Sequence, residues 1–232
     1  KDIIIADISF LDIYLKKIKN KKVLIDKLSC SIYYENILKQ NNFVRNEEDH
    51  IYYLKSKKNK IEIKNSIKSH LIDGLALTKF LFWLKKNYYI KRLSEIDAEK
   101  KLLKFRKQNK KFVSPSFPTI SAAGPNGAII HYRANKSSNR KLKKGDIYLV
   151  DSGGQYKFGT TDVTRTISLN NSDKKIKNIF TRVLKGHIAV SNFTLNPKTT
   201  GSDIDKVARY SLKKINLNYP HGTGHGVGYF AN

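Results

Sequence analysis

The sequence predicts an α+β domain in which helices pack on a mostly antiparallel sheet. Three observations indicate this fold class: amphipathic helical patterns between residues 61 and 105, strands and turns from about 112 to 168, and further helical patterns after residues 172 and 202. This alternation of helical and strand regions favours helices that cover a largely antiparallel sheet.

The first 53 residues combine short strand and helix patterns. Apolar runs of strand length occur at Asp2–Ala6 and Lys22–Asp26, and Ile32–Leu38 has a helical pattern. The stretch Arg45–Lys60 is heavily charged, and we expect a domain boundary within it, between residues 53 and 54.

A long amphipathic helix is expected from Ile61, with Gly74 as a local weak point. Its apolar residues recur at nearly helical spacing and are Ile63, Ile67, Leu71, Leu75, Phe80 and Leu84. A second helix is expected from Ser94, because Asp97 follows three residues later as in a capping box. The apolar face of this second helix would hold Ile96, Leu103 and Phe105.

From Phe112 the sequence changes to strands and turns, punctuated by glycine and proline. Residues Ala128–Tyr132 predict a strand, and a turn at residues 145–146 precedes a buried strand over Ile147–Val150 that delivers Asp151 at its end. Two more helices are expected, one from near Ser172 and one from Ser202.

The net charge of +26, from 45 basic and 19 acidic residues, suggests a polyanionic partner at first sight. Lysine pairs are nevertheless spread over the whole length, so we favour a solvated basic surface and expect no nucleic-acid partner. No apolar run reaches the roughly 18 residues of a membrane span. The single cysteine, Cys30, excludes an internal disulfide and fits a reducing, cytoplasmic location.

We expect the chain to be part of a longer protein. It begins at Lys1, contains no methionine, and stops at Asn232 directly after a glycine-rich motif. A targeting segment upstream of Lys1 therefore stays open.

The first candidate site lies in the stretch from Asp151 to Thr166. A strand that ends in Asp151, a glycine-containing turn and a return strand that opens with Asp162 predict a hairpin. Two neighbouring carboxylates repel each other unless a cation or a proton lies between them, and a divalent metal is the usual partner. The alternative is that Asp151 caps a turn and Asp162 pairs with Arg165 or a lysine; the spacing alone leaves both open.

The second candidate site is the glycine-dense segment His221–Gly228, which contains His221 and His225. Its glycines exclude a helical zinc pair and allow the backbone to approach a ligand closely. His131 follows an apolar run and by itself indicates only a core or edge histidine. His70 and His187 lie in helical patterns and are expected to have structural roles.

Taken together and in this order, the motifs resemble the catalytic domain of the Xaa-Pro aminopeptidases of peptidase family M24. The resemblance covers residues 54–232 and rests on five segments, namely Ser94–Ala98, Phe117–Ser121, Asn126–Tyr132, Asp151–Thr166 and His221–Gly228. It implies a C-terminally truncated pita-bread (creatinase/aminopeptidase-like) catalytic domain. Residues 1–53 resemble the end of a preceding non-catalytic, creatinase-N-like α/β domain, with 26–31 as the modest signal.

The resemblance also implies a reaction and a set of site residues. The reaction is hydrolysis of the bond between an N-terminal residue and a following proline, at two divalent cations that are most often Mn²⁺, with Zn²⁺ or Co²⁺ tolerated. Asp151 would bind one cation, Asp162 would bridge both, and His225 would bind the other. His131 and His221 would contact the substrate and stabilise developing charge. The implied partners are peptides with proline at the second position and a second subunit in a homodimer.

Two further glutamate ligands of the family, one of them its general base, are expected beyond Asn232. We therefore expect the complete protein to be an active peptidase and this chain by itself to be inactive. Two alternatives stay open: a pita-bread protein that kept the fold as a binding module and lost the chemistry, and a basic nucleic-acid-binding protein.

Overall fold

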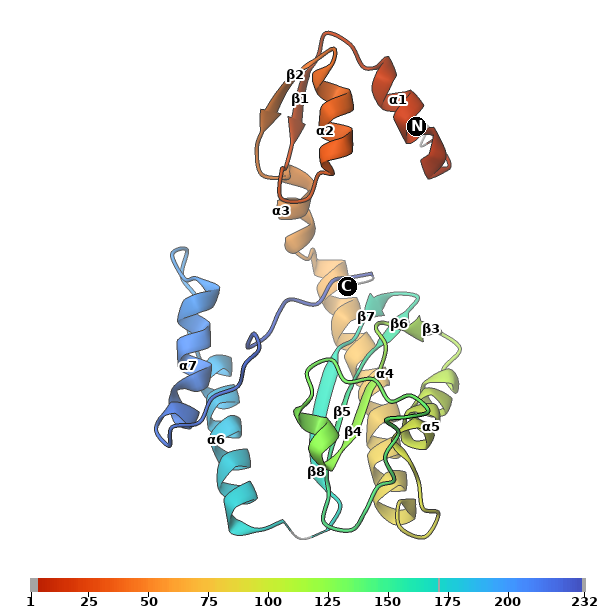
Figure 1. Ribbon diagram of the computed structural model, residues 1–232, viewed down its shortest axis with the longest axis vertical. Helices are drawn as coiled ribbons and strands as arrows, with labels where there is room; N and C mark the ends of the chain where they lie inside the picture. Colours follow the sequence, from red (N-terminus) through yellow and green to blue (C-terminus); the bar gives the residue numbers. More distant parts are fainter. Residues whose placement is uncertain (1–3, 171, 231–232) are drawn as a thin grey trace. The chain divides into compact units, whose positions relative to one another are not determined.

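The computed structural model describes residues 4–170 and 172–230 (Figure 1). The chain divides into two units, Lys1–Lys58 and Asn59–Asn232. This division falls within the charged stretch Arg45–Lys60, where we expected a boundary. The assignment of residues 1–53 and 54–232 to domains of different role stays a prediction.

The first unit is built around a parallel pair of strands with a helical crossover. Its elements are η1 (Ile8–Phe10), α1 (Leu11–Lys17), β1 (Lys22–Ile25), α2 (Ile32–Lys39), β2 (Phe43–Asn46) and α3 (His50–Ser56). Strands β1 and β2 pair in parallel from Lys22↔Phe43 to Ile25↔Asn46, with α2 as the connection that a parallel pair requires. The expected strand over Lys22–Asp26 and helix over Ile32–Leu38 are confirmed.

The expected strand over Asp2–Ala6 is wrong where the structure describes it. Residues 4–6 have no strand structure, and Asp2 and Ile3 lie outside the described residues. Ile4 and Ile5 are 75% and 94% exposed, and residues 4–6 pair with no strand within the described part of the chain. The chain then turns into η1, whose start is capped by Asp7 through the backbone N–H of Ser9.

Two long helices open the second unit, as the sequence predicts. They are α4 (Lys60–Asn87) and α5 (Glu95–Lys107). Helix α4 begins with a capping box between Asn59 and Glu62, and α5 begins with the expected capping box between Ser94 and Asp97. Each box satisfies backbone N–H groups that have no partner within the helix.

The predicted apolar face of α4 is largely wrong, whereas the residues predicted for α5, Ile96, Leu103 and Phe105, are half-buried and Phe105 packs against the core. Of the six apolar residues expected on the buried face of α4, only Phe80 and Leu84 are buried, and the other four are exposed. The buried face of α4 consists of Ser69, Asp73, Ala76, Leu77, Phe80 and Leu84; that of α5 consists of Glu95, Ala98, Leu102 and Arg106. A pattern of apolar residues misses these faces because each contains charged side chains whose hydrogen-bond partners lie far away in the sequence.

Two antiparallel three-stranded sheets follow, which confirms the expected sheet type. One has the order β3 (Phe112–Pro115), β6 (Gly154–Tyr156) and β7 (Gly159–Thr160); the other has the order β4 (Ile120–Ala123), β5 (Ile147–Ser152) and β8 (Val163–Ser168). Along β5, the side chains of Tyr148, Val150 and Ser152 are buried and alternate with those of Ile147, Leu149 and Asp151 on the opposite face. The core contains residues of α4, α5, β4 and β5, among them Leu77, Phe80, Leu84, Ala98, Leu102, Ala123, Tyr148 and Val150.

The expected strand over Ala128–Tyr132 is also wrong. The 3-10 helix η2 (Gly124–Ala128) occupies its start, and His131 lies in a turn with a left-handed φ of 53°. The cause is Tyr132, whose buried hydroxyl donates to a carboxylate oxygen of Glu95 at 2.7 Å. This bond draws the segment toward the start of α5, away from a sheet edge.

The last two helices are α6 (Lys174–Ser191) and α7 (Gly201–Lys213), which start within two residues of the expected positions. The two helices pack closely at Gly186: an added Cβ at this position would lie only 2.3 Å from the carbonyl oxygen of Ala208. Asp173 caps α6, and Thr200 caps α7 in a capping box with Asp203. Within the described residues, no helix combines the length and apolar character that a bilayer crossing requires.

A buried ion pair joins the helices to the sheets. Arg106 Nε and Nη2 donate to the two carboxylate oxygens of Asp73 at 2.7 and 2.9 Å, and both side chains are almost fully buried. Arg106 Nη2 also donates to Ser152 Oγ at 3.0 Å, and Tyr156 OH donates to Asp73 Oδ1 at 2.8 Å. The four residues come from α4, α5, β5 and β6.

Arg106→Met should lower the free energy of unfolding by about 3–5 kcal/mol, because it leaves the Asp73 carboxylate buried without its counter-ion. The double variant Asp73→Leu/Arg106→Met should recover part of this loss, since no unpaired charge remains. Urea unfolding followed by circular dichroism measures both. Arg45→Met is the matched control, because the exposed Arg45–Glu47 pair should contribute less than about 1 kcal/mol. Equal losses in Arg106→Met and Arg45→Met would contradict the prediction.

Candidate metal centre

Between the two candidate aspartates, the backbone at Gly153 packs directly against the backbone at Thr161, and we call this close contact the pinch. A Cβ at this position would lie 1.8 Å from the carbonyl oxygen of Thr161 and 2.2 Å from Ser116 Oγ, so only glycine fits. Across the pinch, the N–H of Gly154 donates to Thr161 Oγ1 at 2.8 Å, and the N–H of Thr161 donates to the Gly154 carbonyl at 2.9 Å. Strands β6 and β7 form the small hairpin beyond this point.

The pinch returns the chain directly into β8, beside β5. The antiparallel register pairs Ser152 with Val163 and Asp151 with Thr164. Asp151 therefore lies on the sheet face opposite the core, and Asp162 enters the return strand next to it. The hairpin expected from the sequence is confirmed, with the β6–β7 excursion inserted between its two strands.

The carboxylates of Asp151 and Asp162 are partly buried and have few hydrogen-bond or charge partners that would stabilise their negative charge. Burial and then the nearby charge of Asp151 raise the pKa of Asp162, while electrostatic interactions with His225 and His70 act in the opposite direction. Oδ1 of Asp151 is buried and has no hydrogen-bond partner within the described part of the chain. A buried, unpartnered carboxylate oxygen costs free energy that a bound cation would recover.

The alternative partner Arg165 does not neutralise Asp162. Its guanidinium Nη1 donates to the carbonyl oxygen of Thr164 at 2.7 Å instead. Among the described residues, neither Asp151 nor Asp162 forms an ion pair with a lysine or an arginine; the one ion-pair partner of Asp162 is His225. This arrangement favours the metal hypothesis over the ion-pair alternative.

His225 faces Asp162, with its Nε2 3.4 Å from Asp162 Oδ2. Its Nδ1 lies 2.8 Å from the carbonyl oxygen of Gly226. Because a carbonyl only accepts, Nδ1 is the protonated nitrogen in this bond, and in the neutral ring the Nε2 lone pair points toward Asp162. This is the tautomer that a metal-binding imidazole with a backbone partner adopts.

The donor set fits a divalent cation. Two carboxylates and a neutral imidazole suit Mn²⁺, Co²⁺ or Zn²⁺. No group of three or more His, Cys, Asp or Glu side chains within residues 4–170 and 172–230 is close enough to hold an ion by itself. The described chain thus contributes Asp162 and His225 as a facing pair with Asp151 beside them.

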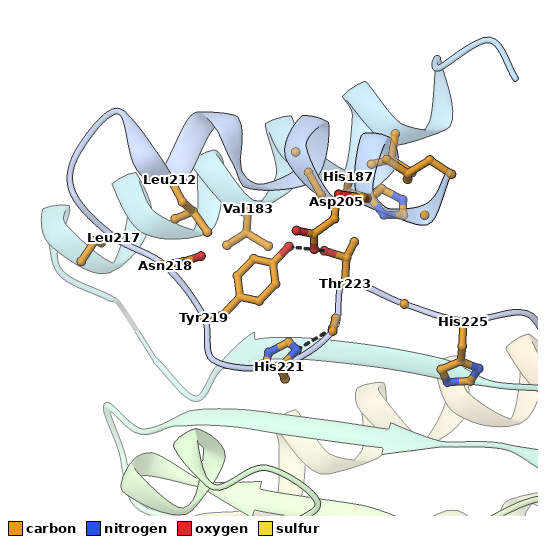
Figure 2. Close-up of a pocket in the computed structure, with 18 of the residues that line it drawn as sticks. Val183, His187, Asp205, Leu212, Leu217, Asn218, Tyr219, His221, Thr223 and His225 are labelled. Carbon is orange, nitrogen blue, oxygen red and sulfur yellow. Dashed lines mark hydrogen bonds between the residues drawn. The ribbon is translucent and has the colours of Figure 1, made fainter. Parts of the chain in front are cut away.

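The structure does not bring His131 into this group. Its imidazole is exposed and forms no hydrogen bond or ion pair with another described residue. His221 is also exposed; its Nδ1 bonds the Gly222 carbonyl at 2.8 Å, and its ring stacks on Tyr219 with 4.7 Å between centroids. Figure 2 shows His221 and His225 on one segment that runs past α7.

Two further histidines lie near these groups. His70, expected to be structural, bonds the Ser66 carbonyl within α4 through Nδ1 at 2.9 Å, and its charge also acts on Asp162. His187 lines the cavity between α6, α7 and the glycine-rich segment, together with Asp205 and His221 (Figure 2). The structure thus adds His70 to the electrostatic surroundings of the aspartates.

Sequence reasoning missed Glu95, which organises the segment that contains His131. The carboxylate is fully buried and accepts from the backbone N–H groups of Ala123 and Arg140 at 2.7 and 2.9 Å. It also accepts from Asn126 Nδ2 at 3.0 Å and from Tyr132 OH at 2.7 Å. Its place at the start of α5 suits a negative charge, but the sequence signals only the helix start.

Comparison with known proteins decides the family. Residues 65–231 match the family described as metallopeptidase family M24. The chain belongs to this family. The family membership confirms the resemblance inferred from the motifs and, with the structural similarity described next, the expected α+β pita-bread fold.

Relatives and a solved structure agree with the M24 assignment. The chain is 46% identical over 181 residues to a protein of Arthroderma otae named probable Xaa-Pro aminopeptidase P, covering 77% of this chain and 29% of the relative. It is 44% identical over 183 residues to aminopeptidase P2 of Arabidopsis thaliana, covering 78% and 26%. The M24 chain therefore spans less than a third of the length of these relatives.

One of the matching solved structures is an X-prolyl aminopeptidase from Caenorhabditis elegans, described as a cytosolic enzyme with a di-nuclear active site. The TM-score is 0.84 at 35% sequence identity, and the match covers 97% of this chain and 37% of that one. The M24 chain thus shares nearly all of its described fold with part of that enzyme.

Gly153→Ala should destabilise the M24 chain by about 3 kcal/mol or more, because the added methyl group meets a backbone carbonyl that cannot move without opening the pinch. Thermal and urea unfolding measure this change. Gly127→Ala is the matched control: its nearest neighbour would be Leu149 Cβ at 3.9 Å, so we expect a change within about 0.5 kcal/mol. A Gly153→Ala variant as stable as Gly127→Ala would show that the pinch does not hold the aspartates in place.

Proposed function

We propose that the complete protein containing this chain is a metal-dependent aminopeptidase that removes the N-terminal residue from peptides with proline at the second position. The observation that carries the proposal is the pair of adjacent aspartates, one with a raised pKa and one with an unpartnered buried oxygen, facing the Nε2 atom of His225. The names of the relatives support the substrate class.

The aspartates and His225 would hold the metal. In this proposal Asp151 binds one cation, Asp162 bridges two, and His225 binds the other; Mn²⁺ is the preferred ion, with Zn²⁺ or Co²⁺ as alternatives. Two such cations supply Lewis-acid polarisation of a carbonyl and hydroxide near neutral pH. Asp162, with its raised pKa, gains most from a cation, because the cation offsets both its burial and its repulsion from Asp151.

His131 and His221 would act on the substrate. Both imidazoles are exposed. His131 is free to donate a hydrogen bond to the peptide carbonyl on which negative charge develops; His221, whose Nδ1 bonds the Gly222 carbonyl, would donate from Nε2 when its ring carries both protons. A well-placed donor of this kind is worth about 3–4 kcal/mol of transition-state stabilisation. The exposed position of His131, which forms no ligand group with the aspartates, supports a role on the substrate and not on the metal.

Several further properties belong to the same proposal. Residues 1–53 form the end of a non-catalytic, creatinase-N-like domain, and the parallel β1–α2–β2 unit supports this view. A cytosolic location is supported by the description of the Caenorhabditis elegans enzyme. We also propose a homodimer as the assembly and no nucleic-acid partner.

Asp162→Asn in the complete protein should lower kcat/KM for an Xaa-Pro peptide by about a hundredfold or more, because a neutral amide is a poor bridging ligand. Mn²⁺ should restore cleavage by the metal-stripped wild type, and calorimetric titration should show weaker Mn²⁺ binding by the variant. Asp203→Asn on exposed α7 is the matched control and should keep wild-type activity. A wild-type protein that takes up no metal and cleaves nothing would favour a pita-bread binding module instead.

The 232-residue chain by itself should show no turnover, because Asp151, Asp162 and His225 do not form a group close enough to hold an ion within its described residues. The same peptide assay with added Mn²⁺ tests this on the purified chain, with the complete protein as the positive control. Metal-dependent cleavage by the isolated chain would contradict the prediction.

A further inference from the structure

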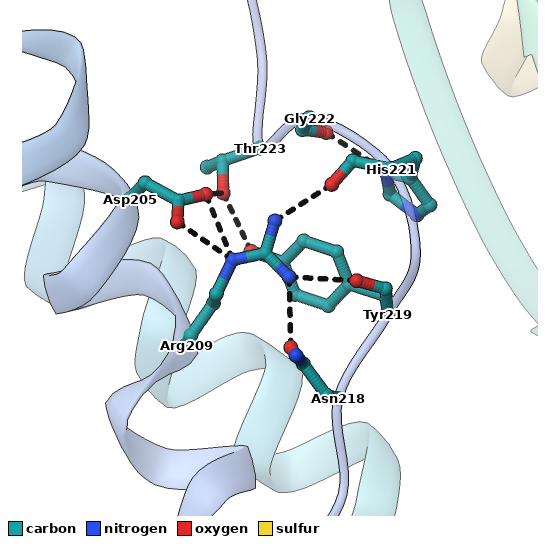
Figure 3. A network of polar contacts seen from close by, with 7 residues as sticks. All are labelled: Asp205, Arg209, Asn218, Tyr219, His221, Gly222 and Thr223. Atoms are coloured by element: carbon teal, nitrogen blue, oxygen red, sulfur yellow. Dashed lines mark hydrogen bonds and ion pairs between the residues drawn. The ribbon is translucent and has the colours of Figure 1, made fainter.

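All three guanidinium nitrogens of Arg209 on α7 donate hydrogen bonds in one small network (Figure 3). Its Nε donates to both carboxylate oxygens of Asp205 at 2.8 Å. Its Nη1 donates to Asn218 Oδ1 at 2.7 Å and to the Tyr219 carbonyl at 2.6 Å, and its Nη2 donates to the His221 carbonyl at 2.6 Å. The side chain is 13% exposed, so this guanidinium is largely shielded from water.

The network closes on itself around His221. The guanidinium of Arg209 lies 3.9 Å from the ring centroid of Tyr219, and the Tyr219 hydroxyl bonds Thr223 Oγ1 at 2.6 Å. Thr223 Oγ1 in turn donates to Asp205 Oδ1 at 2.5 Å. The segment is therefore tied to α7 on both sides of His221 and at the His221 carbonyl itself.

The segment has little else to hold it. A Cβ at Gly222, Gly224 or Gly226 would meet no atom within 4 Å, so the backbone around His221 is not confined by packing. Within the described residues, the His221 imidazole itself contacts only the neighbouring Gly222 carbonyl and the Tyr219 ring. Glycine-rich backbone loses much conformational entropy on ordering, which directional bonds must offset.

We propose that Arg209 is a positioning residue that holds His221 in the orientation its catalytic role requires. The proposal rests on the function proposed above for its kinetic consequences. Arginine is needed because its planar guanidinium donates at once to the Asp205 carboxylate and to three oxygens within residues 218–221. A lysine at this position would keep the ion pair with Asp205 but could not reach the other acceptors at the same time. The Asp205 carboxylate orients the guanidinium of Arg209 and also accepts a hydrogen bond from the Thr223 hydroxyl.

The kinetic signature follows from the place of His221 in the proposed reaction. A hydrogen bond that strengthens in the transition state affects kcat more than KM, and metal binding uses other groups. Loss of the Arg209 bonds should therefore lower kcat with little change in KM. The Asp162–His225 pair does not include the guanidinium, so metal stoichiometry should stay unchanged.

The test compares Arg209→Lys with Arg182→Lys in the complete protein loaded with Mn²⁺. Arg182 is the matched control, because its Nη1 also donates to a backbone carbonyl of α7, Ser211 at 3.0 Å, but does not touch the glycine-rich segment. We expect Arg209→Lys to lower kcat about ten- to hundredfold, with KM within about threefold and unchanged Mn²⁺ content. Amide hydrogen exchange over residues 219–226 should become at least about tenfold faster in Arg209→Lys only.

A second variant keeps the test decisive if Arg209→Lys does not fold. Thr223→Val removes the hydroxyl that closes the network on Tyr219 and Asp205, with nearly unchanged side-chain volume. It should speed exchange over the same segment and lower kcat in the same direction.

Three outcomes would overturn the inference: wild-type kcat in Arg209→Lys, a kcat loss without faster exchange in the segment, or equal effects of Arg209→Lys and Arg182→Lys. If the wild-type protein cleaves no Xaa-Pro peptide, the proposed function fails, and the exchange comparison alone decides the role of Arg209.

Discussion

The buried Asp73–Arg106 pair is the constraint on which the rest of the second unit depends. Two charges removed from water are tolerated only when every donor and acceptor finds a partner, and here the partners come from two helices and two sheets. Ser152 and Tyr156 can satisfy the pair only if β5 and β6 lie at one register against α4 and α5. That register puts Asp151, the neighbour of Ser152, on the opposite face of the sheet.

The same physical principle recurs where the histidines are held. Glu95 fixes the segment on both sides of His131 through two backbone N–H groups and two side chains, and Arg209 fixes the segment around His221 through backbone carbonyls. Both segments are rich in glycine or turns and have little apolar surface to bury. Charge-assisted hydrogen bonds are the means that remain for giving such backbone a single conformation. The packed core thus fixes the position of the aspartates, whereas hydrogen bonds of Glu95 and Arg209 fix the segments that contain His131 and His221.

This division explains which parts of the protein the sequence could predict. Local rules predict the helix starts at Ser94 and near Ser202, and strand alternation predicts the hairpin that brings Asp151 beside Asp162. The strand expected over residues 128–132 failed because Glu95, more than 30 residues away, determines that conformation. The charged residues on the buried helix faces were missed for the same reason, since Asp73 and Arg106 look like surface residues until their partners are known. The approach of His225 to Asp162 spans 63 residues, and only the family resemblance indicated it in advance.

The net charge sharpens the argument for a metal. In a chain with 45 basic residues, a carboxylate has many cationic neighbours, and even the buried Glu35 pairs with Lys27 and Lys39. Within the described residues, Asp151 and Asp162 have no lysine or arginine partner, and the nearby side chains that lower the pKa of Asp162 are the imidazoles of His225 and His70. Arg165, on the strand that Asp162 precedes, bonds a backbone carbonyl instead. Two adjacent carboxylates without a lysine or arginine partner repel each other, which costs stability. Their charge is available to a small cation, whose place a lysine or arginine side chain would otherwise occupy.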